Sequence, residues 1–138
     1  MDINSILSKE KIPEINTLSP LTLAFLGDSV YEMFVRTKIL SMGNRPANEL
    51  HKIAVGYVKA KAQAVAAHKI FDILTEEETD IYKRGRNTNI HTVPKNADMA
   101  DYRHATALEA LIGYLYLKGE DERLNEILNI AFETLSHD

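Results

Sequence analysis

Apolar residues recur three and four positions apart along almost the whole chain, and no segment alternates as a half-buried strand would. This spacing gathers apolar side chains on one face of an α-helix. It predicts five helices, covering about residues 20–40, 47–70, 75–84, 101–117 and 122–135. The predicted fold class is therefore all-α, a helical bundle.

The expected helix ends carry recognisable signals. Ser19 can cap the first helix ahead of Pro20, and residues 43–46, Gly-Asn-Arg-Pro, end it. Acidic residues 76–78 suit the positive end of the third helix dipole, and Gly119 closes the fourth helix. The segment 85–98 is the one long irregular stretch that the pattern predicts.

Length and composition indicate one domain. The chain has 138 residues, 45% of them hydrophobic, which is enough for a single core, so we expect one domain over 1–138 with its core at about 18–135. It has no cysteine, which excludes disulfides, thiolate zinc sites and a cysteine nucleophile. No leader-like or membrane-spanning apolar run occurs, so a cytoplasmic location without membrane contact is expected.

Asp28 is a lone acid inside the apolar run 21–31, directly after Gly27. Burying an unpaired carboxylate costs several kcal/mol (order of magnitude), so Asp28 is expected to have a cation, a hydrogen-bond partner or a functional role. Glu32 and Arg36 share its stripe and are expected to pair on the surface. An exposed Asp28 beside them is the alternative.

Glu109 repeats the pattern as the lone acid of the apolar segment 105–117, with Gly113 one turn later. A glycine inside a helix lets another element approach closely. Two such helices suggest that Asp28 and Glu109 meet across a helix pair, where two carboxylates suit a hard cation such as Mg²⁺. A structural ion pair is the alternative.

The net charge of −4 is unevenly distributed, because residues 49–71 and 83–104 carry an excess of cations and 118–138 an excess of acids. Cations and short polar side chains gather in 82–89 and 93–96, a composition that suits nucleic-acid phosphates. The candidate RNA-binding residues are Lys83, Arg84, Arg86, Asn87 and Lys95. An ordinary solvated loop is the alternative.

Two motifs resemble a known family. Residues 21–32, LTLAFLGDSVYE, resemble the signature helix of ribonuclease III, and residues 106–117, TALEALIGYLYL, resemble its second acidic helix. The segments KRGRN at 83–87 and PKN at 94–96 are similar to the compact Mini-ribonuclease III branch, which consists of the endonuclease domain alone. The resemblance covers about 18–135.

This resemblance implies an all-helical homodimer that cuts both strands of double-stranded RNA with Mg²⁺ and leaves 5′-phosphate ends. Asp28 and Glu109 match the family's catalytic, metal-binding acids. The Mini branch further implies maturation of the large-subunit (23S) ribosomal RNA precursor, without a double-stranded-RNA-binding domain.

The chain departs from full-length ribonuclease III at three positions. Leu21 and Ala24 stand where the larger enzymes have glutamates, and Thr106 where they have an aspartate. The missing acids motivate an alternative, a catalytically inert RNA-binding or ribosome-associated module, and a plain interaction bundle is a third hypothesis. Phe25 matches an aromatic that joins the subunits, or it packs in the core.

Overall fold

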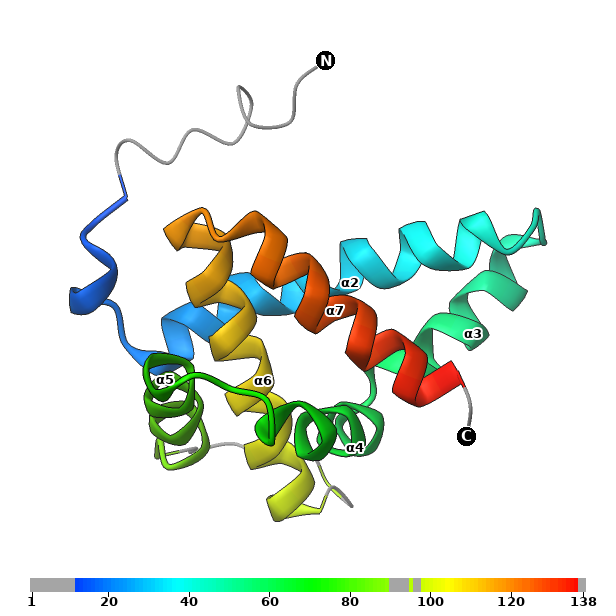
Figure 1. Ribbon diagram of the computed structural model, residues 1–138. Coiled ribbons are helices and arrows are strands. Elements are labelled where there is room, and N and C mark those ends of the chain that lie inside the picture. The colour runs from blue at the N-terminus through cyan, green and yellow to red at the C-terminus, as the bar shows by residue number, and fades with distance from the viewer. Residues whose placement is uncertain (1–11, 90–94, 96–97, 137–138) are drawn as a thin grey trace.

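The computed structural model describes residues 12–89, 95 and 98–136 (Figure 1). Within these residues the chain is helical and contains no strand, which confirms the all-α prediction. The elements are a 3₁₀ turn η1 (Ile15–Thr17) and the α-helices α2 (Pro20–Ser41), α3 (Ala47–Val58), α4 (Ala60–Phe71), α5 (Glu76–Arg86), α6 (Met99–Lys118) and α7 (Asp121–Ser136).

Helix α6 forms the centre of the bundle and packs against α2, α4, α5 and α7 (Figure 1). From Ala105 to Leu115 every residue is buried except Glu109. Because neighbours cover all its sides, α6 is apolar all round in this stretch. Glu109 is therefore the exception in the most buried helix of the described chain.

The predicted helix ends are confirmed where capping groups set them. The Ser19 hydroxyl accepts a hydrogen bond from the Thr22 amide at 3.2 Å and starts α2. Gly119 ends α6 in the left-handed region, with φ of 77°. Most of the expected irregular segment before Asp98, including Pro94, lies outside the described residues.

The predicted single helix over 47–70 is wrong, because the chain forms two helices that break at Lys59. Lys59 has extended backbone angles, φ −63° and ψ 152°. Two buried side chains satisfy carbonyls that this break releases: Tyr31 Oη donates to Tyr57 O at 3.0 Å, and Gln63 Nε2 donates to Val58 O at 2.8 Å. Neither Lys59 nor the residues on either side of it are proline or glycine, and contacts from outside α3 help to stabilise the break.

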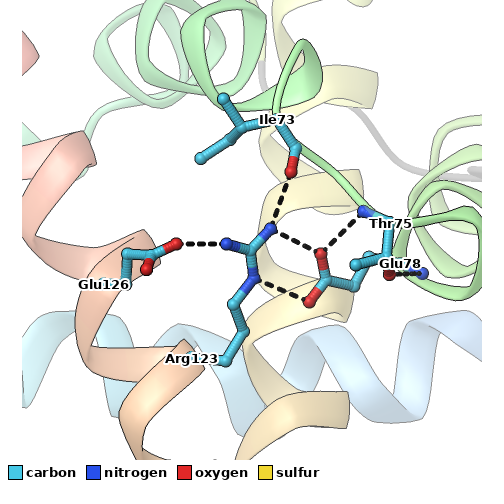
Figure 2. A network of polar contacts seen from close by, with 5 residues as sticks. All are labelled: Ile73, Thr75, Glu78, Arg123 and Glu126. Carbon is cyan, nitrogen blue, oxygen red and sulfur yellow. Dashed lines mark hydrogen bonds and ion pairs between the residues drawn. The ribbon is translucent and has the colours of Figure 1, made fainter.

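A polar network joins the start of α5 to α7 (Figure 2). Thr75 and Glu78 form a reciprocal capping box, and Arg123 of α7 donates to both Glu78 carboxylate oxygens at 2.8 and 2.9 Å and to Ile73 O at 2.8 Å. Arg123 also pairs with Glu126. The Arg123 hydrogen bonds lower the pKa of Glu78, so this acid serves the α5–α7 contact as well as the helix dipole.

No helix in the described part of the chain is long and apolar enough to cross a membrane.

Candidate active site

Two glycines bring the backbones of α2 and α6 into direct contact. A Cβ atom at Gly27 would lie 1.8 Å from the Glu109 carbonyl oxygen, and one at Gly113 would lie 2.1 Å from the Leu23 carbonyl oxygen. Real Cβ atoms do not approach other atoms so closely, so only glycine permits this crossing. The crossing places Asp28, the neighbour of Gly27, beside Glu109, one turn before Gly113.

The side chains of Asp28 and Glu109 meet across this crossing and form a hydrogen-bond contact. Burial first, and then the hydrogen bond and the charge of Asp28, raise the pKa of the Glu109 carboxyl to about 9. The charge of Glu32 acts in the same direction. At neutral pH without a metal, Glu109 therefore holds a proton.

The two acids differ in exposure. The sequence left open whether Asp28 is buried or exposed, and in the structure Asp28 is exposed whereas Glu109 is partly buried. Gly27 faces α6 and is buried, and a helix turns by about 100° per residue, so Asp28 lies at the edge of the contact. Glu32 and Arg36 form the predicted surface ion pair, with an N–O distance of 2.9 Å.

The acid pair fits a hard divalent cation. The Glu109 carboxyl holds a proton at neutral pH beside Asp28, and a cation bound between the two groups can take the place of this proton. Within the described residues no group of three or more histidine, aspartate or glutamate side chains is arranged to hold a metal ion by itself. Oxygens from two carboxylates, with water and phosphate completing the shell, suit Mg²⁺.

Gln63 of α4 is a polar neighbour of the acid pair that the sequence analysis missed. Gln63 is 4% exposed, and its amide lies close enough to the Glu109 carboxyl to lower the pKa of that acid through hydrogen bonding. The available signal was one uncharged polar residue in the alanine-rich stretch 60–67. Thr106, also buried, instead donates to Tyr102 O at 2.9 Å.

The candidate RNA-binding residues gather at the C-terminal end of α5, apart from Lys95. Lys83 and Arg84 are exposed, and Arg86 donates to Asn87 Oδ1 at 3.1 Å. Lys95 is exposed as well. Lys83, Arg84 and Arg86 thus lie on a helix that packs beside α6, with Asn87 at its C-cap, and their contact with RNA stays a prediction.

Gly85 explains how closely this basic end approaches α6. A Cβ atom at Gly85 would lie 3.0 Å from Ala107 Cα and 3.1 Å from Ala110 Cβ. Both alanines are near neighbours of Glu109 in the sequence of α6. The basic end of α5 therefore packs against the part of α6 that carries Glu109.

Phe25 of α2 is 81% exposed, so it does not pack in the core of this chain. Leu21 and Met33 are also exposed, at 45% and 56%. With Ser29 these residues recur every four positions and form one stripe along α2, next to Asp28. We call residues Leu21, Phe25 and Met33 the exposed α2 stripe.

Comparison with known proteins identifies the family. Residues 21–120 match the family model of the ribonuclease III domain, and both acids lie inside this match. The Mini-ribonuclease 3 of Thermoanaerobacter sp. (strain X514) is 50% identical over 135 residues, which cover 98% of this chain and 93% of the relative. The chain belongs to the Mini-ribonuclease 3 branch of the ribonuclease III family.

Other relatives agree with this assignment. The Mini-ribonuclease 3 of Symbiobacterium thermophilum is 52% identical over 83% of this chain and 88% of the relative. A crystal structure of a protein from Fusobacterium nucleatum superposes with a TM-score of 0.78 at 38% identity, covering 86% of this chain and 95% of that one. As a Mini-ribonuclease 3 family member, the chain is an endoribonuclease with the helical bundle of the ribonuclease III domain.

Proposed function

We propose that this endoribonuclease cleaves both strands of double-stranded RNA and depends on magnesium. The contact between the Asp28 and Glu109 carboxyls at the α2–α6 crossing is the observation that carries the proposal. A structural acid pair of this kind lowers stability, whereas a cation-binding pair has a chemical use. The ribonuclease III family as a whole consists of metal-dependent enzymes that act on double-stranded RNA.

In this proposal the chain supplies carboxylate oxygens and geometry. Asp28 and Glu109 hold the cation, and Glu109 releases its proton for binding. When bound, Mg²⁺ supplies Lewis acidity at the scissile phosphate and neutralises the charge that develops there. Water adds at phosphorus and the bond to the 3′-oxygen breaks, leaving a 5′-phosphate and a 3′-hydroxyl.

The basic end of α5 is proposed to hold the RNA backbone. Lys83 and Arg84 are exposed and free to contact phosphate oxygens, and Arg86, Asn87 and Lys95 extend the same chemistry. Such contacts position a duplex without reading its sequence. They also make RNA affinity fall as salt concentration rises.

A homodimer is proposed because the exposed α2 stripe offers an apolar surface beside the acid pair. Phe25, at 81% exposure, supports the interface rather than the core interpretation of this residue. One chain carries one acid pair, whereas a duplex has two strands, and a two-fold dimer presents two pairs.

The proposed physiological substrate is the precursor of large-subunit (23S) ribosomal RNA, and the proposed location is therefore the cytoplasm. The similarity to the Mini-ribonuclease 3 branch supports both proposals. Accumulation of this precursor in cells that lack the protein is the observation that tests them.

The proposal is tested by cleavage of a defined RNA duplex with Mg²⁺ and with EDTA. Asp28→Asn and Glu109→Gln each remove one carboxylate with little change in shape. We expect both variants to lose at least about 100-fold in cleavage rate, equivalent to ~3 kcal/mol, while they still bind the duplex.

Glu133→Gln is the matched control, because Glu133 is an exposed acid of α7 far along the chain from both helices of the crossing. It is expected to cleave like the wild type. Full activity in both Asp28→Asn and Glu109→Gln would contradict the proposed site. Duplex binding by the wild type without any magnesium-dependent cleavage would favour the inert module instead.

A further inference from the structure

Gln63 is the buried polar side chain that α4 contributes next to the acid pair. It is 4% exposed and lies among alanines. A buried amide costs free energy unless its donors and acceptors are paired. An apolar residue at this position would avoid that cost, so we ask what the contacts of the Gln63 amide contribute.

The side-chain amide of Gln63 lies between the end of α3 and the carboxyl group of Glu109. It donates to Val58 O, at the end of α3, at 2.8 Å, and the same amide lies close enough to the Glu109 carboxyl to lower the pKa of that acid. A primary amide nitrogen carries two hydrogens, so it can donate to the Glu109 carboxylate while it donates to Val58 O. The Gln63 amide thereby links the Glu109 side chain to the break between α3 and α4.

A second buried side chain fixes the same break. Tyr31, three residues after Asp28 on α2 and 0% exposed, donates to Tyr57 O at 3.0 Å. The α3–α4 break is thus held from the helix that carries Asp28, and through Gln63 it holds the side chain of Glu109. This gives Gln63 a fixed frame against which to orient a carboxylate.

The carbonyl oxygen of Gln63 distinguishes this amide from a purely structural one. Oε1 is buried and has no hydrogen-bond partner within the described residues. A side chain selected only to stabilise the helix break is expected to pair both ends, because an unpaired buried acceptor is costly. The unpaired Oε1 lies on the same amide group that contacts Glu109.

We propose that Gln63 is a positioning residue, which holds the Glu109 carboxylate in the orientation that binds the divalent cation. This inference rests on the proposed function, because it assumes that Asp28 and Glu109 bind a metal. Partners that orient metal ligands typically change metal affinity by about 10- to 100-fold when they are removed. Gln63 acts through Glu109 and is not itself a proposed ligand.

The test is Mn²⁺ binding to the RNA-free protein, followed by the electron paramagnetic resonance signal of free Mn²⁺. Gln63→Met keeps the length and approximate volume of the side chain but cannot donate a hydrogen bond. We expect it to bind Mn²⁺ at least about 10-fold more weakly than the wild type. We also expect its Mg²⁺ requirement for cleavage to rise by a similar factor, while duplex binding in EDTA stays unchanged.

Ile70→Val is the matched control, because Ile70 is buried on the same helix two turns from Gln63. It loosens α4 without touching the acid pair and is expected to keep wild-type Mn²⁺ affinity. If Gln63→Met fails to fold, Gln63→Asn takes its place, since it keeps an amide that is one methylene too short to span both partners. Weaker Mn²⁺ binding is expected there as well.

The outcomes separate this inference from the proposed function. Mn²⁺ affinity in the Gln63 variant within twofold of the wild type, with binding lost in Asp28→Asn, would overturn the role of Gln63 and leave the metal site intact. Unchanged Mn²⁺ binding in both Asp28→Asn and Glu109→Gln would overturn the metal site itself. A loss of binding in Ile70→Val equal to that in the Gln63 variant would show general loosening and overturn the positioning role.

Discussion

The position of Glu109 beside Asp28 lowers the free energy of unfolding of the metal-free protein. Its carboxyl is partly buried in α6, and its pKa is raised to about 9 by burial first and then by Asp28. The folded state therefore binds a proton that the unfolded chain has already released between about pH 4.5 and pH 9. The free energy of unfolding of the metal-free protein decreases as pH rises through this window.

Replacing the acid removes this pH dependence. We expect Glu109→Gln, in EDTA, to melt at a higher temperature than the wild type near pH 8.5 and at a similar temperature near pH 5, because glutamine resembles the protonated acid. Thermal unfolding followed by circular dichroism at the two pH values measures the difference. Melting curves that run parallel for wild type and Glu109→Gln across the range would contradict it.

At the scale of single residues, the sequence predicted that Asp28 and Glu109 meet, but it did not predict which residues surround them. Asp28 and Glu109 stood out as lone acids beside glycines in apolar helices. Their relative burial depends on how the helices rotate against each other, so the sequence left open whether Asp28 is buried, and the structure shows it exposed. Gln63 was missed because its meaning comes from contacts with Val58 and Glu109, which lie in two other helices.

At the scale of elements, the crossing of α2 and α6 decides whether the two acids meet. Gly27 and Gly113 bring each backbone against the other. Any side chain at these positions forces the helices apart, and the rest of the bundle resists because α6 is packed on its other sides as well.

Gly27→Ala tests this arrangement. Its Cβ would lie 1.8 Å from the Glu109 carbonyl oxygen, so we expect a loss of about 3 kcal/mol in the free energy of unfolding and a large loss of cleavage. Urea denaturation measures the stability. Gly56→Ala on α3, with no atom within 4 Å, is the control and is expected to gain up to ~1 kcal/mol from helix propensity. Equal stability of the two variants would contradict the backbone contact.

Helix ends were predictable where local capping groups set them, as at Ser19, Thr75 and Gly119. The break at Lys59 was not, because buried groups on α2 and α4 accompany it instead of a local signal. The bond from Arg123 to Glu78 was not predictable either, since it joins positions 45 residues apart.

At the scale of the whole molecule, the exposed α2 stripe is an unusual surface for a chain that acts alone. Phe25 is 81% exposed, and the other two residues of the stripe, Leu21 and Met33, are exposed as well. The sequence left open whether Phe25 packs in the core or at an interface, and its exposure removes the first alternative. We propose that a second copy of the chain packs against this stripe.

Phe25→Asp is expected to shift the protein from dimer to monomer, because it places a charge in an apolar interface. Size-exclusion chromatography with light scattering measures the mass. Met99→Asp is the control, since Met99 is exposed at the start of α6 and lies outside the stripe. An unchanged dimer in Phe25→Asp, or a wild-type chain that is monomeric at high concentration, would contradict the proposed interface.

The central claim, that Asp28 and Glu109 together bind a divalent cation, is tested most directly by NMR titration of the Glu109 side-chain carboxyl carbon with and without Mg²⁺. Without metal we expect its pKa to be about 9, and with saturating Mg²⁺ we expect it to fall below neutrality, because the cation replaces the proton. Asp28→Asn is expected to reduce the effect of Mg²⁺. A Glu109 titration that Mg²⁺ leaves unchanged would contradict the account.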